Sequence, residues 1–158
     1  TVGALVAVNA LGSAVVPGER HYWAAPFEIG GEFGDLGPAE KAVPAVVPGL
    51  DKRETEAGTN TTIAIVGTDA SLDKAAAARL ADAAHDGMAR ALVPAHTPFD
   101  GDLVFGVSTG SGPPVDAQMQ MALGHAASLC LARAIARAVF EARPEEGDLL
   151  PAWCQLAD

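Results

Sequence analysis

The chain has 158 residues, of which 49% are apolar and 19% charged, and its formal net charge at pH 7 is −10. This length and composition are typical of one tightly packed globular domain and exclude a disordered chain. The negative charge argues against nucleic acid or an anionic membrane as a partner. The sequence shows no apolar run that we expect to span a bilayer and no basic, apolar leader, so we expect a cytoplasmic protein.

The first predicted element is a buried strand, because the residues from Val2 to Val8 are all apolar or small. Such a strand needs neighbours on both edges and both faces, so we expect the chain to be part of a longer protein or one piece of a complex. Asn9 stands at the end of this strand. It is either a turn-former that closes the strand or an amide donor to an oxyanion or substrate.

A long, ordered loop is predicted from Ala14 to Asp51, which is rich in Gly and Pro and lacks the periodicity of a helix or strand. We expect its aromatic residues to anchor the loop to the body of the protein, although they could instead line a pocket: Tyr22, Trp23, Phe27 and Phe33. The charged run from Asp51 to Glu56 is expected to be solvated.

The stretch from Gly58 to Ala70 joins a polar turn to an apolar run. Gly58 and Asn60 favour turn conformations, and the residues from Thr61 to Val66 have the β-branched composition of a buried strand. Hydroxyl groups at the start of such a strand are held rigidly beside the preceding peptide bond. We therefore hypothesise that the Asn60–Thr61 bond is a self-cleavage site. Cleavage would give Thr61 a free α-amino group, which titrates near neutrality and can act as the base for its hydroxyl.

Two helices are predicted from apolar residues at helical spacing. The first runs from Leu72 to Ala91, with Asp69 or Ser71 as its cap. We expect it to bury Leu80, Ala83, Ala84, Met88 and Ala91. The second runs from Val115 to Ala142, and we expect it to bury Met119, Met121, Ala122, Ala126, Leu129, Ala136, Val139 and Phe140. His85 and Asp86 are adjacent and point to different sides of the first helix, which indicates surface roles.

A rigid loop from Pro94 to Asp102 leads into a predicted strand, Leu103 to Thr109. On an extended backbone the carboxylates of Asp100 and Asp102 lie on the same side, where one of them would tend to keep a proton. Such a pair suits hydrogen bonding to a nucleophile and its amino group, and the alternative is a simple Asp-Gly turn.

No metal or other cofactor is expected. His96 has no second His or Cys at ligand spacing, and Cys130 and Cys154 stand far apart. Nothing in the sequence supports a disulfide between the two cysteines.

Three motifs, in the same order along the chain, resemble one family. The strand from Thr1 to Ala10 is similar to the one that closes the larger part of the DmpA-type self-processing hydrolases. The sequence Asn60-Thr61-Thr62-Ile63, followed by Thr68-Asp69-Ala70, resembles their processing site, and His96 to Asp102 resembles their third motif. The family includes L-aminopeptidase/D-esterases, β-aminopeptidases and nylon-oligomer hydrolases. The threonine and the Asp-Gly-Asp pattern look most like the nylon-oligomer branch.

The resemblance, which covers the chain to about Ala142, implies a fold. It is a four-layer αββα sandwich like that of N-terminal-nucleophile hydrolases, with DmpA-type topology, and this chain would be one part of it. Residues 1–60 would end the larger subunit, residues 61–142 would form the smaller subunit, and residues 143–158 would be a C-terminal tail. An upstream segment of the same protein or a partner chain would complete the fold and supply further catalytic residues.

The resemblance also implies roles for four residues. Thr61 would be the nucleophile, Asn9 would help to hold the oxyanion, and Asp100 and Asp102 would bind the new α-amino group and tune the nucleophile. The expected activity is hydrolysis of an amide or peptide bond in a small peptide or amide substrate, by an aminopeptidase, an amidase or an oligoamide hydrolase. The Ala-rich helix faces and the tail also predict a homo-oligomer.

Three alternatives remain from the sequence. Thr1 could be the nucleophile in place of Thr61. The chain could belong to a self-cleaving N-acetyltransferase of related architecture, although the Ala-Thr-Met processing segment of those enzymes is absent here. It could also be a degenerate, non-catalytic relative that acts as a binding or assembly subunit.

Overall fold

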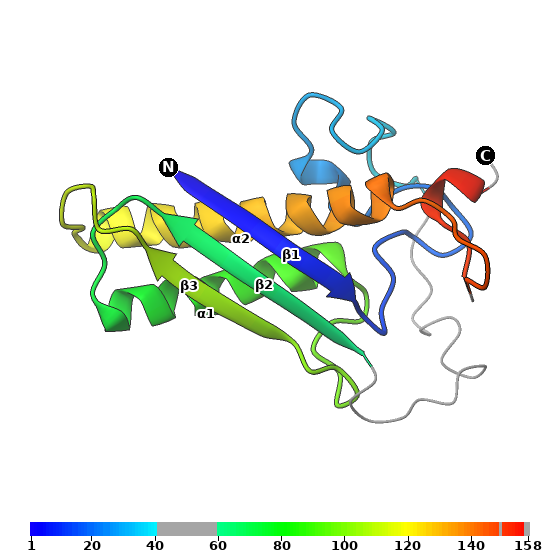
Figure 1. Cartoon of the computed structure of the whole chain (residues 1–158). Helices are drawn as coiled ribbons and strands as arrows, with labels where there is room; N and C mark the ends of the chain where they lie inside the picture. Colours follow the sequence, from blue (N-terminus) through cyan, green and yellow to red (C-terminus); the bar gives the residue numbers. More distant parts are fainter. Residues whose placement is uncertain (41–59, 149, 157–158) are drawn as a thin grey trace.

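The computed structural model describes residues 1–40, 60–148 and 150–156. Three strands form one sheet in the order β1-β2-β3, with β1 antiparallel and β3 parallel to the central strand. Two helices cover one face of this sheet (Figure 1). The elements are β1 (Val2–Asn9), β2 (Thr61–Thr68), α1 (Lys74–Ala91), β3 (Leu103–Ser108) and α2 (Ala117–Glu141), with short 3-10 helices η1 (Ala25–Phe27) and η2 (Trp153–Gln155). The arrangement is a mixed α/β fold, as the sequence predicts.

The three predicted strands are confirmed, and β1 and β2 extend one or two residues beyond their predicted ends. Strand side chains alternate between the two faces of a sheet. On β2, every second side chain is buried under the helices: Thr62, Ala64, Val66 and Thr68. The turn at Gly58, the charged run from Asp51 to Glu56 and the second part of the predicted long loop lie outside the described residues.

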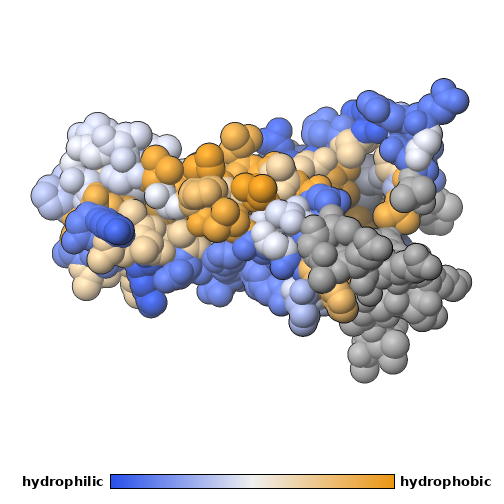
Figure 2. Space-filling model, turned by 60° about the horizontal axis from the view of Figure 1, so that its bottom comes forward, coloured by the Kyte–Doolittle hydropathy of each residue, from blue (hydrophilic) through white to orange (hydrophobic). Residues whose placement is uncertain are grey.

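The other face of the sheet is apolar and open. Leu5 and Phe105 on this face are 73% and 50% exposed. The large apolar side chains that project from this face are Leu5, Ile63, Ile65, Leu103, Phe105 and Val107. Figure 2 shows apolar side chains gathered across the middle of the molecule in a view turned toward its lower side. A contiguous apolar surface of this kind marks an interaction site for a protein, a membrane or a ligand.

The first helix begins later than predicted. Its N-cap is Asp73, whose Oδ1 accepts a hydrogen bond from the backbone N–H of Ala76 at 2.8 Å. Neither Asp69 nor Ser71 caps the helix, because the chain first pairs Ser71 with Pro114 before it turns into the helical conformation. The predicted buried face is largely correct, and it also includes Gly87.

The predicted core face of α2 is wrong in its first turns but correct toward its end, where Ala136 is buried and Val139 and Phe140 pack against the core. Met119 and Met121 are 49% and 71% exposed, because the first turns of α2 bury none of their side chains. The buried side is instead Leu123, Gly124, Ala127, Ser128, Leu131, Ala132, Ile135 and Ala136. Apolar residues occur on every side of this helix, so their spacing did not single out the face that packs.

Glycines allow the helices to lie close to their neighbours. A Cβ on Gly87 of α1 would be 2.3 Å from the carbonyl oxygen of Ser128 in α2. A Cβ on Gly106 of β3 would be 2.2 Å from the carbonyl oxygen of Ala77 in α1. The helix layer is therefore held tightly against the sheet, which fixes the backbone that carries the candidate site.

Aromatic side chains anchor the described part of the long loop, as predicted. Tyr22 and Phe33 are buried and pack edge to face, and the ring of Trp153 from the C-terminal tail stacks on Tyr22 at 5.7 Å. Arg133 of α2 also binds both carboxylate oxygens of Glu32 in the loop. The Arg133 guanidinium holds the pKa of the Glu32 carboxyl below its usual range. The loop and the tail are thus fixed to α2.

Helix α2 is also long and apolar enough to cross a membrane by length and composition, which the sequence analysis did not anticipate. Part of its surface is buried against the sheet and α1, and eight of its residues lie in the core. The apolar side chains of α2 are therefore also explained by packing within the fold, without a membrane.

Candidate active site

The candidate residues come together at one end of the sheet. Asn9, the last residue of β1, is directly opposite Thr61, the first residue of β2. Asn60 forms an isolated parallel bridge with Asp100, just before β3 begins. Strand pairing alone therefore brings together three segments that are far apart in the sequence.

Thr61 and Thr62 point to opposite faces of the sheet. The Thr62 side chain is fully buried under the helices, and its Oγ1 has no hydrogen-bond partner among the described residues. Thr61 lies on the open face together with Asn9, since residues directly opposite each other in an antiparallel pair project to the same side. Of the two hydroxyl groups, only that of Thr61 is placed to meet a substrate from the open side.

The Thr61 hydroxyl lies against the peptide bond that precedes it. Its Oγ1 donates a hydrogen bond to the carbonyl oxygen of Asn60 at 2.6 Å. The same carbonyl oxygen accepts a second hydrogen bond, from the backbone N–H of Gly101 at 2.9 Å. The carbonyl group of the predicted cleavage site is thus fixed from two directions.

Asp100 ties two loops together beside this peptide bond. Its Oδ1 accepts from the backbone N–H of Leu11 at 3.0 Å, which holds the chain just after β1. Its Oδ2 accepts from the backbone N–H of Thr97 at 3.1 Å and from the Thr97 hydroxyl at 2.5 Å. These bonds place Asp100 between the end of β1 and the loop that leads into β3.

Asp102 holds the backbone on the other side of Thr61. Its Oδ1 accepts from the backbone N–H of Thr62 at 3.0 Å, and its Oδ2 lies 3.0 Å from Nδ1 of His96. The side chain of Asp102 is only 5% exposed. Within the described part of the chain, Asp100 and Asp102 each bind their own partners. That one of the two carboxylates keeps a proton stays a prediction.

His96 belongs to this cluster, although no catalytic role was predicted for it from the sequence. Its φ of 55° lies in the left-handed region, which is strained for a non-glycine residue and which the ring contacts help to maintain. Besides Asp102, its ring contacts the carbonyl oxygen of His85 through Nε2 at 3.3 Å, and the two imidazoles meet edge to face. Burial lowers the pKa of His85, and the nearby charge of His96 lowers it further. The signal in the sequence was the position of His96 between two prolines, just ahead of the carboxylates.

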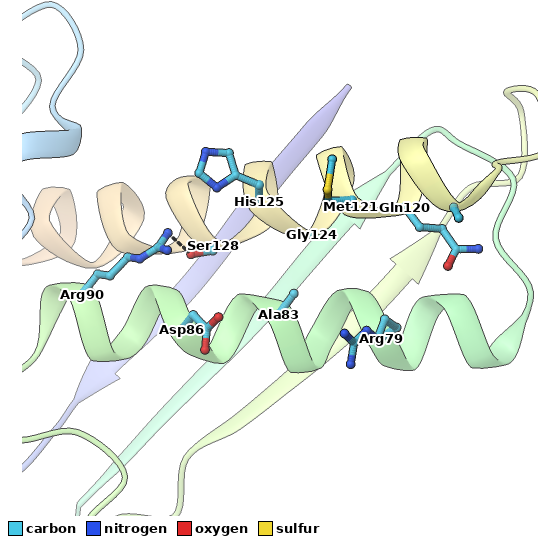
Figure 3. A pocket seen from close by; sticks show the side chains of 10 residues that line it. Arg79, Ala83, Asp86, Arg90, Gln120, Met121, Gly124, His125 and Ser128 are labelled. Atoms are coloured by element: carbon cyan, nitrogen blue, oxygen red, sulfur yellow. Dashed lines mark hydrogen bonds between the residues drawn. The ribbon is translucent and has the colours of Figure 1, made fainter.

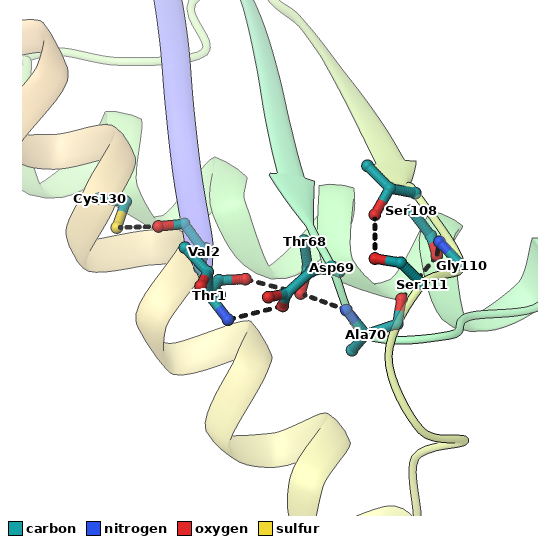
Figure 4. Close-up of polar contacts among 10 residues, drawn as sticks. Thr1, Val2, Thr68, Asp69, Ala70, Ser108, Gly110, Ser111 and Cys130 are labelled. Atoms are coloured by element: carbon teal, nitrogen blue, oxygen red, sulfur yellow. Dashed lines mark hydrogen bonds and ion pairs between the residues drawn. The ribbon is translucent and has the colours of Figure 1, made fainter.

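Thr1 lies at the opposite end of the sheet from this cluster. Its amino group is 2.6 Å from Oδ1 of Asp69, and its carbonyl oxygen accepts from the Thr68 hydroxyl at 2.8 Å (Figure 4). Asn9 and Asp100 therefore lie beside Thr61 and not beside Thr1.

A separate cavity of about 350 Å³ opens between α1 and α2 (Figure 3). The polar side chains in its lining include Arg79, Asp86, Gln120 and His125. Arg90, which also lines it, donates to the Ser128 hydroxyl at 2.5 Å. This cavity lies in the helix layer, whereas Thr61 faces the other side of the sheet. The two features are therefore distinct.

Metal-binding groups are sparse in the residues that the structure describes. Residues 1–40, 60–148 and 150–156 contain no group of three His, Cys, Asp or Glu side chains placed to hold a metal ion. Cys130 and Cys154 are both free thiols. The cluster around Thr61 offers a hydroxyl, an amide, carboxylates and an imidazole.

The chain matches a known protein family and several curated relatives. Residues 1–149 match the model of peptidase family S58. The chain is 40% identical to uncharacterized aminopeptidases of Mycobacterium bovis and Mycobacterium tuberculosis, over 93% of this chain and 46% of each relative. It is 37% identical to an uncharacterized aminopeptidase of Mycobacterium leprae, over 98% of this chain and 44% of the relative.

The chain therefore spans about half the length of the curated relatives it matches. The family is the one that the DmpA-type motifs indicate. The matched region contains Asn9, Thr61 and both carboxylates. This chain belongs to peptidase family S58.

Proposed function

We propose that this chain carries the processing site and the nucleophile of a self-cleaving hydrolase that acts on amide or peptide bonds. The observation that carries the proposal is the 2.6 Å contact between the Thr61 hydroxyl and the carbonyl oxygen of Asn60. The hydroxyl is already beside the carbonyl group that it would attack, and such proximity is the main requirement of an intramolecular acyl transfer.

Self-cleavage proceeds in two steps. Oγ1 of Thr61 attacks the carbonyl carbon of Asn60, the C–N bond between the two residues breaks, and the hydroxyl proton ends on the departing nitrogen. That nitrogen becomes the α-amino group of Thr61. Water then hydrolyses the ester that joins Asn60 to Oγ1, which releases the Asn60 carboxylate and restores the hydroxyl.

Substrate turnover uses the same hydroxyl. The free amine of Thr61 accepts its proton while Oγ1 takes the acyl group of a small peptide or amide, and the amine product leaves with that proton. A second water releases the acid. The position of Asn9 opposite Thr61 supports its role as an oxyanion donor in both reactions. Asp100 and Asp102, which hold the loops on either side of Thr61, are suited to bind the new amino group.

The rest of the protein is proposed to cover the open sheet face. An upstream segment of the same protein, or a partner chain, would lay a second sheet on this apolar surface and complete the αββα sandwich. The exposed Leu5 and Phe105 support this arrangement, because a buried partner would remove their apolar surface from water. The site at the end of the sheet would then open between the two layers.

Two observations bear on the class of substrate that we propose. The threonine at position 61 and the Asp-Gly-Asp pattern at 100–102 favour the nylon-oligomer branch and therefore an oligoamide substrate. The names of the mycobacterial relatives favour removal of an N-terminal residue from a small peptide. A homo-oligomer and a cytoplasmic location stay predictions from the sequence.

Two neighbouring threonines allow a matched test of the mechanism. The full-length protein and its Thr61→Ala and Thr62→Val variants would be followed by intact mass during incubation. We expect the wild type and Thr62→Val to split between Asn60 and Thr61 and to hydrolyse amide substrates. Thr61→Ala should remain intact and inactive. A Thr61→Ala chain that is still cut at this bond would overturn the proposal.

The same experiment separates the non-catalytic alternative. A wild-type protein that stays in one piece after long incubation, and that releases no amine from amide substrates, would identify a binding or assembly subunit. Release of the acyl group to an added amine but not to water would instead identify an acyltransferase.

A further inference from the structure

Gly101 lies directly against the peptide bond that is proposed to break. Its backbone N–H donates to the carbonyl oxygen of Asn60 at 2.9 Å. This is the same oxygen that accepts from the Thr61 hydroxyl. Gly101 reaches it from the β3 side, whereas Asn9 approaches Thr61 from the β1 side.

The absence of a side chain at Gly101 matters for space and not for backbone conformation. Gly101 does not have a positive φ, so an L-residue could adopt its backbone conformation. A Cβ built on Gly101 would lie 2.9 Å from Oγ1 of Thr61 and 3.8 Å from both Cβ of Thr61 and the carbonyl oxygen of Asn60. The atom that it would crowd most is therefore the attacking oxygen itself.

We propose that Gly101 is a catalytic residue of the self-cleavage step, an inference that rests on the function proposed above. Its N–H polarises the carbonyl group of Asn60, and its missing side chain leaves room for the Thr61 hydroxyl beside that group. When Oγ1 bonds to the carbonyl carbon, the π electrons move onto the oxygen. The hydrogen bond from Gly101 then strengthens, because it meets a developing negative charge.

The ordinary role of this hydrogen bond would be strand pairing, since Asn60 and Asp100 form a parallel bridge. Strand pairing explains the N–H contact but not the position of the glycine, because an alanine can pair equally well. The 2.9 Å approach to Oγ1 is what links Gly101 to the reaction.

The test is Gly101→Ala in the full-length protein, with cleavage followed by intact mass. Alanine keeps the backbone N–H, but its Cβ would displace Oγ1 of Thr61. Misplacement of a reacting group by about 1 Å slows a reaction by about 100-fold, and we expect a loss of this size. The matched control is Gly67→Ala in β2, where a Cβ meets nothing closer than the Val107 carbonyl oxygen at 3.9 Å. This control should cleave at the wild-type rate.

A second variant covers the case in which Gly101→Ala does not fold. Thr61→Ala removes Oγ1, so adding Gly101→Ala to it should leave the melting temperature within about 2 °C of the Thr61→Ala protein. If the double variant is also unfolded, Gly101 is needed for the fold itself and the inference is wrong.

The outcomes separate this inference from the proposed function. Wild-type protein that cleaves, together with a folded Gly101→Ala variant that cleaves within a few-fold of the wild-type rate, overturns the role of Gly101 and leaves Thr61 in place. Wild-type protein that never cleaves overturns the proposed function. A folded Gly101→Ala variant that accumulates as the uncut chain supports both.

Discussion

The two faces of the sheet carry similar side chains that serve different purposes. On the helix side, β2 presents Thr62 and Thr68 among small apolar residues, and close packing with α1 and α2 seals them from water. On the open side, Thr61 and Asn9 stand at the edge of a broad apolar surface that nothing in the described chain covers. A hydroxyl on the first face can serve only structure, whereas one on the second can meet a substrate.

The difference arises from one backbone property. Successive strand residues point to opposite sides, so neighbouring threonines are divided between the two faces. The pairing of Asn9 with Thr61 then adds an amide on the same side as the reactive hydroxyl.

The largest effect is expected from Phe105→Ala on the open face of the full-length protein. If a second sheet covers Phe105, the substitution leaves a cavity and lowers the free energy of unfolding by about 3 to 5 kcal/mol. The comparison is Ile29→Ala, which removes an apolar side chain that is 64% exposed in the anchored loop and should change stability by less than about 0.5 kcal/mol. Equal, small losses in urea unfolding would show that the open face stays in water.

Asn9→Ala tests the polar end of the open face. Removal of an oxyanion donor costs about 100- to 1000-fold in kcat, and we expect slower self-cleavage and slower amide hydrolysis to a similar degree. Asn9 lies at the end of β1 and is exposed in this chain, so the melting temperature should change little. Rates near the wild-type values would assign Asn9 to closing the strand and not to catalysis.

Thr62→Val tests the closed face. The buried Oγ1 of Thr62 has no partner among the described residues, and an unsatisfied buried hydroxyl is destabilising by about 1 to 3 kcal/mol. Valine has nearly the same shape, and the backbone N–H that binds Asp102 is kept. We therefore expect the free energy of unfolding to rise by about 1 kcal/mol with cleavage unchanged. A loss of stability would reveal a partner for this hydroxyl in the full-length protein.

Glu32→Gln gives the smallest effect and depends on pH. The pKa of Glu32 is lowered by Arg133, so the pair contributes stability that is fully present above about pH 4.3, the pKa of an unfolded glutamate. This contribution is lost as the pH falls through the lower pKa of the folded state. Because both side chains are partly exposed, we expect a difference between wild type and variant of about 1 kcal/mol at pH 7 that shrinks toward pH 3. Urea unfolding at the two pH values measures it, and a constant difference would contradict the assignment.

The sequence was enough to predict the strands, because a continuous β-branched run has few alternatives to a buried strand. The choice of Thr61 over Thr62 stays a prediction from the family motif, and it agrees with the placement of Thr61, and not Thr62, on the open face. The residue at which α1 begins was harder to predict from the sequence. Asp69, Ser71 and Asp73 can each cap a helix, and only the tertiary bridge from Ser71 to Pro114 decides among them.

The contacts that His96 and Gly101 make could not be predicted from the sequence. The place of His96 between two prolines is visible there, but its contact with Asp102 depends on an unusual positive φ that no local pattern indicates. Gly101 lies against Thr61, 40 residues earlier in the chain, and such contacts depend on the register of β2 and β3. The packing face of α2 escaped prediction because the whole helix is rich in small apolar residues.

The most direct test of the account is to locate the acyl-enzyme. The full-length protein would be treated with a reactive ester, digested and examined by mass spectrometry for the residue that carries the acyl group. We predict a single label on Thr61 at the start of a newly formed chain, and none on Thr62. A label on Thr1, or on a chain still joined at Asn60, would contradict the assignment of the nucleophile.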